Sequence, residues 1–187
     1  MDNERFMSRF GISSGLAYGL LFQSILVIFA AIISIWGLFA IFDKGIFTVR
    51  YLTNVISLLL CISLLVYSFY GFNAKRNQEM FFITSVVLYI ILIIFGLFTS
   101  SFDYKNPISL LTLITLISAV FFLHEYTKSY VSANFAMLIV IISGLLVVIF
   151  DMFGGMQWFI ALKYIIFPVT IGLTYFERVQ RGKYQFL

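Results

Sequence analysis

The chain has 187 residues, of which 62% are hydrophobic and 11% are charged, and its formal net charge is +4. Soluble domains carry about 25% charged residues, so this composition, with a mean hydropathy of +1.06, excludes an ordinary soluble domain. The positive charge does not indicate a nucleic-acid partner either, because no basic patch is interleaved with aromatic residues on a soluble face.

Five stretches of the chain contain no Asp, Glu, Lys, Arg or His: Phe10–Phe42, Tyr51–Ala74, Met80–Phe102, Asn106–Leu123 and Ser129–Phe150. A membrane-spanning helix needs about 20 mostly apolar residues, so each stretch is a candidate span. A sixth, from about Met156 to Phe176, contains one lysine, Lys163. The sequence predicts an all-α fold in one membrane domain over residues 1–187: a polytopic bundle of six transmembrane helices at about 13–42, 51–73, 80–102, 107–126, 131–152 and 156–176.

The first predicted helix opens with three glycines spaced four residues apart, Gly11, Gly15 and Gly19, and Gln23 continues the same stripe. A spacing of four is close to one helical turn, so these residues share one face. Small residues let a second helix approach closely. The stripe predicts a packing surface, which either contacts another helix of the bundle or docks a second copy or a partner protein.

The chain offers few reactive groups. Cys61, in the second predicted helix, is the only cysteine, which excludes an intrachain disulfide and a thiolate zinc site. His124 and Glu125 mark the end of the fourth helix, where we expect the imidazole to be solvated. Cys61 at mid-span and His124 at the surface differ by about 15 Å in depth, so they cannot form a nucleophile–base pair. We expect no catalytic residue, no metal and no cofactor.

The three outward turns share a sequence feature. Each odd-numbered helix ends in Phe-Asp, and each even-numbered helix returns to a basic, aromatic-rich end; the Phe-Asp pairs are Phe42-Asp43, Phe102-Asp103 and Phe150-Asp151. This pattern predicts three helical hairpins in the same orientation, a parallel repeat whose axis lies along the membrane normal. Aromatic residues also favour membrane interfaces in any six-span protein, which is the alternative explanation.

Lys163 is the basic residue that needs a partner. A lysine at the centre of a span costs about 2.5–3.5 kcal/mol to insert. If the sixth helix begins near Met156, Lys163 lies about 10 Å from its start. Helical side chains lean toward the N-terminus of their helix, so the ammonium is aimed at the level of Asp43, Asp103 and Asp151.

Two interpretations of Lys163 stay open. In the first, Lys163 pairs with one of these aspartates near the outer surface and holds the bundle together. In the second, it receives an anionic ligand or a lipid headgroup in an outward-facing pocket. Pro168 agrees with both, because it removes a backbone hydrogen bond and bends the helix beside the lysine.

The distribution of basic residues predicts the orientation. With six spans both termini share one side, and that side holds Arg5, Arg9, Lys75, Arg76, Lys128, Arg178, Arg181 and Lys183. The other side holds Lys44, Arg50 and Lys105. Both termini are therefore expected in the cytoplasm, where the basic residues contact anionic lipid headgroups.

The two-helix units with short outer turns and basic returns resemble HdeD-like small membrane proteins of bacteria. The resemblance is a hydropathy rhythm over the whole chain. It implies a multi-pass protein of a bacterial cell membrane with a non-enzymatic, stress-associated role. We expect a subunit, regulator or stress-associated factor that acts through helix contacts, with a second copy or another membrane protein as partner. The alternative is a substrate-binding component of a transporter, or a small channel, with an anionic or amphipathic ligand near Lys163, because six helices in a chain of this length also resemble the substrate-capture components of energy-coupling-factor vitamin transporters.

Overall fold

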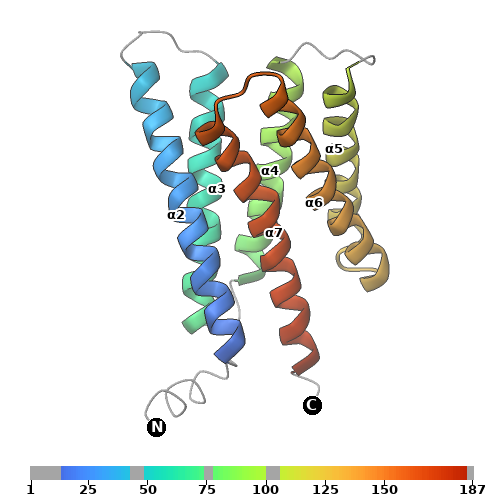
Figure 1. Cartoon of the computed structure of the whole chain (residues 1–187). Coiled ribbons are helices and arrows are strands. Elements are labelled where there is room, and N and C mark those ends of the chain that lie inside the picture. Colours follow the sequence, from blue (N-terminus) through green and yellow to red (C-terminus); the bar gives the residue numbers. More distant parts are fainter. Residues whose placement is uncertain (1–13, 43–48, 74–77, 100–105, 185–187) are drawn as a thin grey trace.

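The computed structural model describes residues 14–42, 49–73, 78–99 and 106–184. Within these ranges the chain is helical, with no strand. The helices are α2 (Ser14–Phe42), α3 (Val49–Asn73), α4 (Gln78–Thr99), α5 (Pro107–Glu125), α6 (Tyr130–Phe153) and α7 (Trp158–Tyr184), drawn in Figure 1. All 6 are long and apolar enough to cross a membrane. The prediction of an all-helical bundle with six membrane-spanning helices is confirmed.

Local sequence explains where α5 and α6 begin and how the chain turns from α6 into α7. The side chain of Asn106 caps α5 by accepting a hydrogen bond from the backbone N–H of Ile108 at 3.0 Å, and Pro107 occupies the first turn, where its missing N–H costs nothing. Ser129 caps α6. The turn from α6 to α7 includes Gly155 at φ 98°, a backbone conformation that glycine adopts without strain.

The last helix is longer than predicted. Its predicted end, residue 176, was where the apolar stretch stops, but α7 continues to Tyr184. The added segment contains Glu, Arg, Gln and Lys, which are good helix formers. Helix propensity therefore extends α7 beyond the apolar part of the chain.

The six helices form a closed ring, and α7 also makes contacts across its middle. Each helix packs against the next along the chain, α2 packs against α7, and α4 also packs against α7. Figure 1 shows the result: α4 and α7 lie in the middle, with α2 and α3 on one side and α5 and α6 on the other. We call the end where α2 begins and α7 ends the terminal end, and the opposite end the far end.

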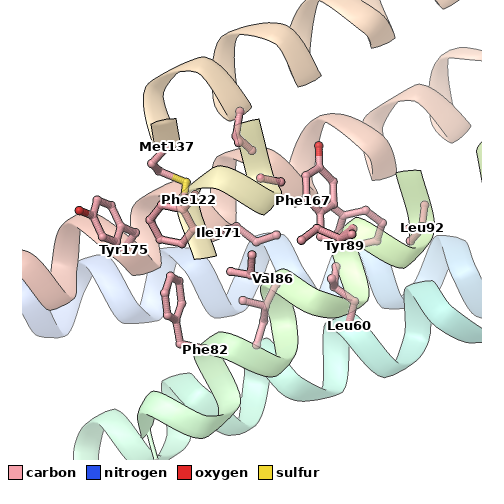
Figure 2. Close-up of a cluster of buried hydrophobic side chains, with 14 of the residues drawn as sticks. Leu60, Phe82, Val86, Tyr89, Leu92, Phe122, Met137, Phe167, Ile171 and Tyr175 are labelled. Carbon is pink, nitrogen blue, oxygen red and sulfur yellow. The ribbon is translucent and has the colours of Figure 1, made fainter. Parts of the chain in front are cut away.

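Burial follows this arrangement. In the apolar window of α7, the part of Ile160–Val179 that is long and apolar enough to cross a membrane, 61% of residues are buried. The corresponding windows of α5 and α2 have 22% and 28% of their residues buried. The central core joins Leu60 of α3, Val86 of α4 and Phe167 and Ile171 of α7 (Figure 2). The outer faces of α2, α5 and α6 carry large exposed apolar side chains, as expected where lipid is the solvent.

Exposed phenylalanines occur along the whole bundle, but the far end also carries both tryptophans of the chain. The exposed aromatic side chains at this end include Trp36 and Phe39 of α2, Phe98 of α4, Phe153 of α6 and Trp158 of α7. Tryptophan rings favour the boundary between hydrocarbon and headgroups. They indicate the level at which α7 enters the membrane.

Glycines allow α6 and α7 to approach closely. A Cβ added to Gly144 would lie 2.8 Å from the Tyr89 hydroxyl and 3.2 Å from the Cβ of Pro168. A Cβ added to Gly172 would collide with the side chain of Ile141. Small residues at such crossings increase the dispersion contact between helices in lipid.

Candidate functional site

Lys163 lies inside the bundle. Its side chain is 3% exposed, and its ammonium donates a hydrogen bond to Oδ1 of Asn54 at 2.9 Å. Lys163 is the sixth residue of α7 and Asn54 is the sixth residue of α3, and both helices begin at the far end (Figure 1). At 1.5 Å per residue, both lie about 7.5 Å from the start of their helix, so the amide is at the depth of the ammonium.

Three helices meet at this pair. The Lys163 ammonium also lies 4.7 Å from the centre of the Tyr164 ring, which adds a cation–π attraction. On the other side, α2 contributes Gly37, where an added Cβ would lie 2.8 Å from both the nitrogen and the oxygen of the Asn54 amide. Gly37 therefore leaves the space that the Asn54 side chain occupies. We call Gly37, Asn54, Lys163 and Tyr164 the lysine node.

The predicted aspartate partners take different places. Asp43 and Asp103 lie outside the described residues. Asp151 is partly buried in the last turn of α6. Among the described residues, basic and acidic side chains lie within 4.0 Å of one another at His124 and Glu125 and at Arg178 and Glu79, so Lys163 and Asp151 are not such a pair. The acceptor that the structure provides is a neutral amide.

Pro168 lies inside α7, which continues through it from Trp158 to Tyr184. Its ring packs against α6 at Gly144. Near it, the hydroxyl of Thr170 donates to the carbonyl of Ile166 at 2.7 Å and lies 3.1 Å from that of Phe167. The predicted bend at Pro168 stays a prediction.

The glycine stripe of the first helix divides into parts with different surroundings. Gly11 lies outside the described residues, and Gly15 belongs to α2, where only its backbone is described. Gly19 is exposed, and a Cβ added there would meet nothing within 4 Å. Gln23 is 1% exposed and donates to the Thr174 hydroxyl at 2.5 Å. The inward-facing part of the stripe is thus at Gln23, against α7.

A second polar contact holds α7 near the terminal end. The hydroxyl of Tyr67 on α3 donates to Oε2 of Glu177 at 2.6 Å. Both side chains are buried, with exposures of 0% and 8%. On the other flank of α7, the hydroxyl of Tyr175 donates to Oδ1 of Asn134 on α6 at 2.7 Å. Side chains of α2, α3 and α6 thus all bind α7.

An aromatic cluster fills the terminal end of the bundle. The rings of Phe82, Phe122, Tyr126 and Tyr175 lie 5.0 to 6.3 Å apart. The guanidinium of Arg178 lies 5.6 Å from the Phe82 ring centre and 6.0 Å from that of Tyr126. Burial raises the pKa of the Tyr126 hydroxyl above its ordinary value, and Arg178 opposes that shift. The cluster joins α4, α5, α7 and the turn after α5.

His124 lies at the surface beside charged neighbours. Its side chain is 61% exposed, its Nδ1 lies 2.9 Å from the Glu125 carboxylate, and its Nε2 lies 2.8 Å from the Lys128 ammonium. Lysine only donates, so Nε2 accepts and Nδ1 carries the proton. Cys61 is 1% exposed and belongs to the core. In the described ranges no group of three or more His, Cys, Asp and Glu side chains could hold a metal ion.

The sequence interpretation missed Asn54, Gly37 and Glu177. A search for charge alone passes over asparagine, because an amide does not interrupt an uncharged stretch. Depth was no clearer a signal: with the predicted helix starts at 51 and 156, Asn54 lay four residues shallower than Lys163, and only the observed starts at Val49 and Trp158 bring them to one depth. Comparison with protein-family models, curated proteins and solved structures gives no match.

Proposed function

We propose that this chain is a small non-enzymatic multi-pass membrane protein that acts through helix contacts, as a subunit or regulator of a larger membrane assembly. The observation that supports this is the burial of Lys163. Its ammonium is bound by Asn54 and covered by Tyr164, so the basic group within the span holds helices together. A ligand-binding role would leave that group open to the ligand.

The test uses thermal unfolding of the purified protein in mild detergent, followed by native mass spectrometry. Lys163→Met removes the charge and keeps much of the apolar stem. We expect the variant to unfold at a lower temperature than the wild type, because the hydrogen bond from Lys163 to Asn54 is lost. In native mass spectrometry, we expect a second polypeptide, either another copy or a different chain, to be bound to the wild type and to the variant alike.

The contradicting result is equally specific. Inorganic phosphate, citrate and a fatty acid serve as anionic and amphipathic probes in the same assay. If one of them raises the unfolding temperature of the wild type but not of Lys163→Met, and the variant alone is as stable as the wild type, Lys163 is a ligand site.

The finer expectations belong to the same proposal. The HdeD-like rhythm supports a stress-associated role in a bacterial cell membrane, and the basic residues support contact with anionic lipid on the cytoplasmic side. The three-hairpin repeat also stays a prediction. Of its Phe-Asp pairs, Phe150-Asp151 lies wholly within the described residues.

A second candidate function, a transporter component or small channel, is favoured by the order of the helices. The halves α2–α3–α4 and α5–α6–α7 cross the membrane in opposite directions (Figure 1). If α2, α3 and α4 are matched to α5, α6 and α7, each helix contact has a counterpart. The α2–α3 contact corresponds to α5–α6, α3–α4 to α6–α7 and α2–α7 to α4–α5, and the α4–α7 contact corresponds to itself. Such inverted repeats occur in many secondary transporters. A ligand would reach Lys163 only if α7 moved away from α3, and the probe assay above tests this.

A further inference from the structure

The last helix combines the lowest hydropathy with the deepest burial. The apolar window of α7 has a mean hydropathy of 1.3, whereas those of the other five helices range from 1.9 to 2.8. Yet 61% of that window is buried, more than in any other described helix. A helix that lipid alone had to accept would show the opposite combination, because polar side chains in hydrocarbon are unfavourable.

The polar side chains of α7 lie on one face. Lys163, Thr170, Thr174 and Glu177 are separated by seven, four and three residues, a spacing that keeps them on one side of a helix. Their exposures are 3%, 0%, 0% and 8%. We call these four residues the polar face of α7.

Three of these four residues have partners on α2 and α3, whereas the Thr170 hydroxyl bonds to carbonyls of α7 itself. Asn54 of α3 accepts from Lys163, Gln23 of α2 donates to Thr174, and Tyr67 of α3 donates to Glu177. Along the chain, these partners precede the α7 residues that they bind by 109, 151 and 110 residues. The α2–α3 pair is itself well packed. When α7 emerges during synthesis, both of these helices have already been made.

We propose that α7 does not enter the membrane on its own hydropathy, and that the α2–α3 pair is its acceptor. A lysine at the centre of a span shifts the insertion equilibrium by on the order of 100-fold against the membrane, and Lys163, about 7.5 Å from the start of α7, carries part of that cost. The α2–α3 pair offsets this cost of insertion. The amides of Asn54 and Gln23 and the phenol of Tyr67 lie within hydrogen-bonding distance of the polar face of α7. Asn54 and Gln23 therefore serve the placement of a helix made more than 100 residues later.

The experiment measures on which side of the membrane the end of α7 lies. A reporter cysteine, Tyr184→Cys, is placed in the full chain with Cys61→Ala, and an impermeant maleimide labels it from either side of membrane vesicles. A chain in which α7 fails to insert exposes this cysteine on the opposite side. The measured quantity is the fraction of chains whose reporter cysteine is labelled from the opposite side. Lower accumulation of a variant therefore does not affect it.

The test variant combines Asn54→Leu, Gln23→Leu and Tyr67→Phe, and leaves the sequence of α7 unchanged apart from the reporter cysteine. We expect its misplaced fraction to rise at least about ten-fold over the reference, a conservative part of the shift that a buried lysine causes. Adding Lys163→Leu should return the fraction to the reference value. The matched control, Thr115→Val with Ser143→Ala, removes a 2.8 Å hydroxyl contact between α5 and α6 and should change nothing.

Three results would overturn the proposal. The first is a misplaced fraction in the test variant equal to the reference, which means that α7 inserts unaided. The second is an equal rise in the α5–α6 control, which means that any loss of packing has this effect. The third is a rise that Lys163→Leu does not reverse, which means that the buried lysine is not the reason.

Discussion

At the scale of single residues, the lysine node shows how a membrane protein keeps a charge in its interior. An ammonium surrounded by hydrocarbon is unfavourable, but a neutral amide at hydrogen-bonding distance replaces part of its hydration. Asn54 provides that amide at 2.9 Å. A carboxylate would have to be desolvated as well, which offsets much of the attraction between buried opposite charges.

Gly37 is the residue of the node whose replacement is most diagnostic. In Gly37→Ala, the added methyl group would lie 2.8 Å from the Asn54 amide, so either the amide or α2 must move. We expect the free energy of unfolding to fall by about 1–3 kcal/mol, the usual effect of overpacking. Unfolding in mixed detergent measures the change.

The matched control for this substitution is on the same helix. In Gly19→Ala the new Cβ meets nothing within 4 Å, and alanine is the better helix former. Its free energy of unfolding should stay within about 0.5 kcal/mol of the wild type. Equal destabilisation by both changes would mean that Gly37 acts through helix flexibility, and that the space beside Asn54 is irrelevant.

At the scale of elements, the α6–α7 crossing depends on small residues and on Pro168. A Cβ on Gly144 would lie 2.8 Å from the Tyr89 hydroxyl and 3.2 Å from Pro168, so in Gly144→Ala either the Tyr89 side chain or α6 must shift. We expect a loss of about 1–3 kcal/mol in the free energy of unfolding. Gly96→Ala is the control, because its Cβ would meet nothing within 4 Å. A stable Gly144→Ala variant would show that the close crossing does not contribute to stability.

The elements were the part of the structure that the sequence predicted best. Uncharged stretches locate membrane helices because every backbone polar group in hydrocarbon must be bonded within the helix, and charged residues mark where water begins. The same signal misplaced the end of α7, since a helix can extend into water beyond Phe176. It also could not identify Asn54, because an uncharged amide leaves the hydropathy pattern nearly unchanged.

At the scale of the whole molecule, the arrangement of helices was less accessible from sequence than the helices themselves. The outer faces and the core are both apolar, so hydropathy does not indicate which face of a helix is turned inward. The polar side chains carry that information. Lys163, Thr174 and Glu177 turn α7 toward α2 and α3, and Tyr175 ties its other flank to α6. The central position of α7 follows from these contacts.

The central claim is that the charge of Lys163 is held by Asn54 inside the bundle, and a double-mutant cycle of Asn54→Leu and Lys163→Met in unfolding experiments tests it most directly. We expect Asn54→Leu to lower the free energy of unfolding by about 2–3 kcal/mol, since it leaves a buried ammonium without its acceptor. In the double variant that loss should largely disappear, giving a coupling of at least about 1 kcal/mol. Additive effects of the two substitutions, with no coupling, would contradict the claim.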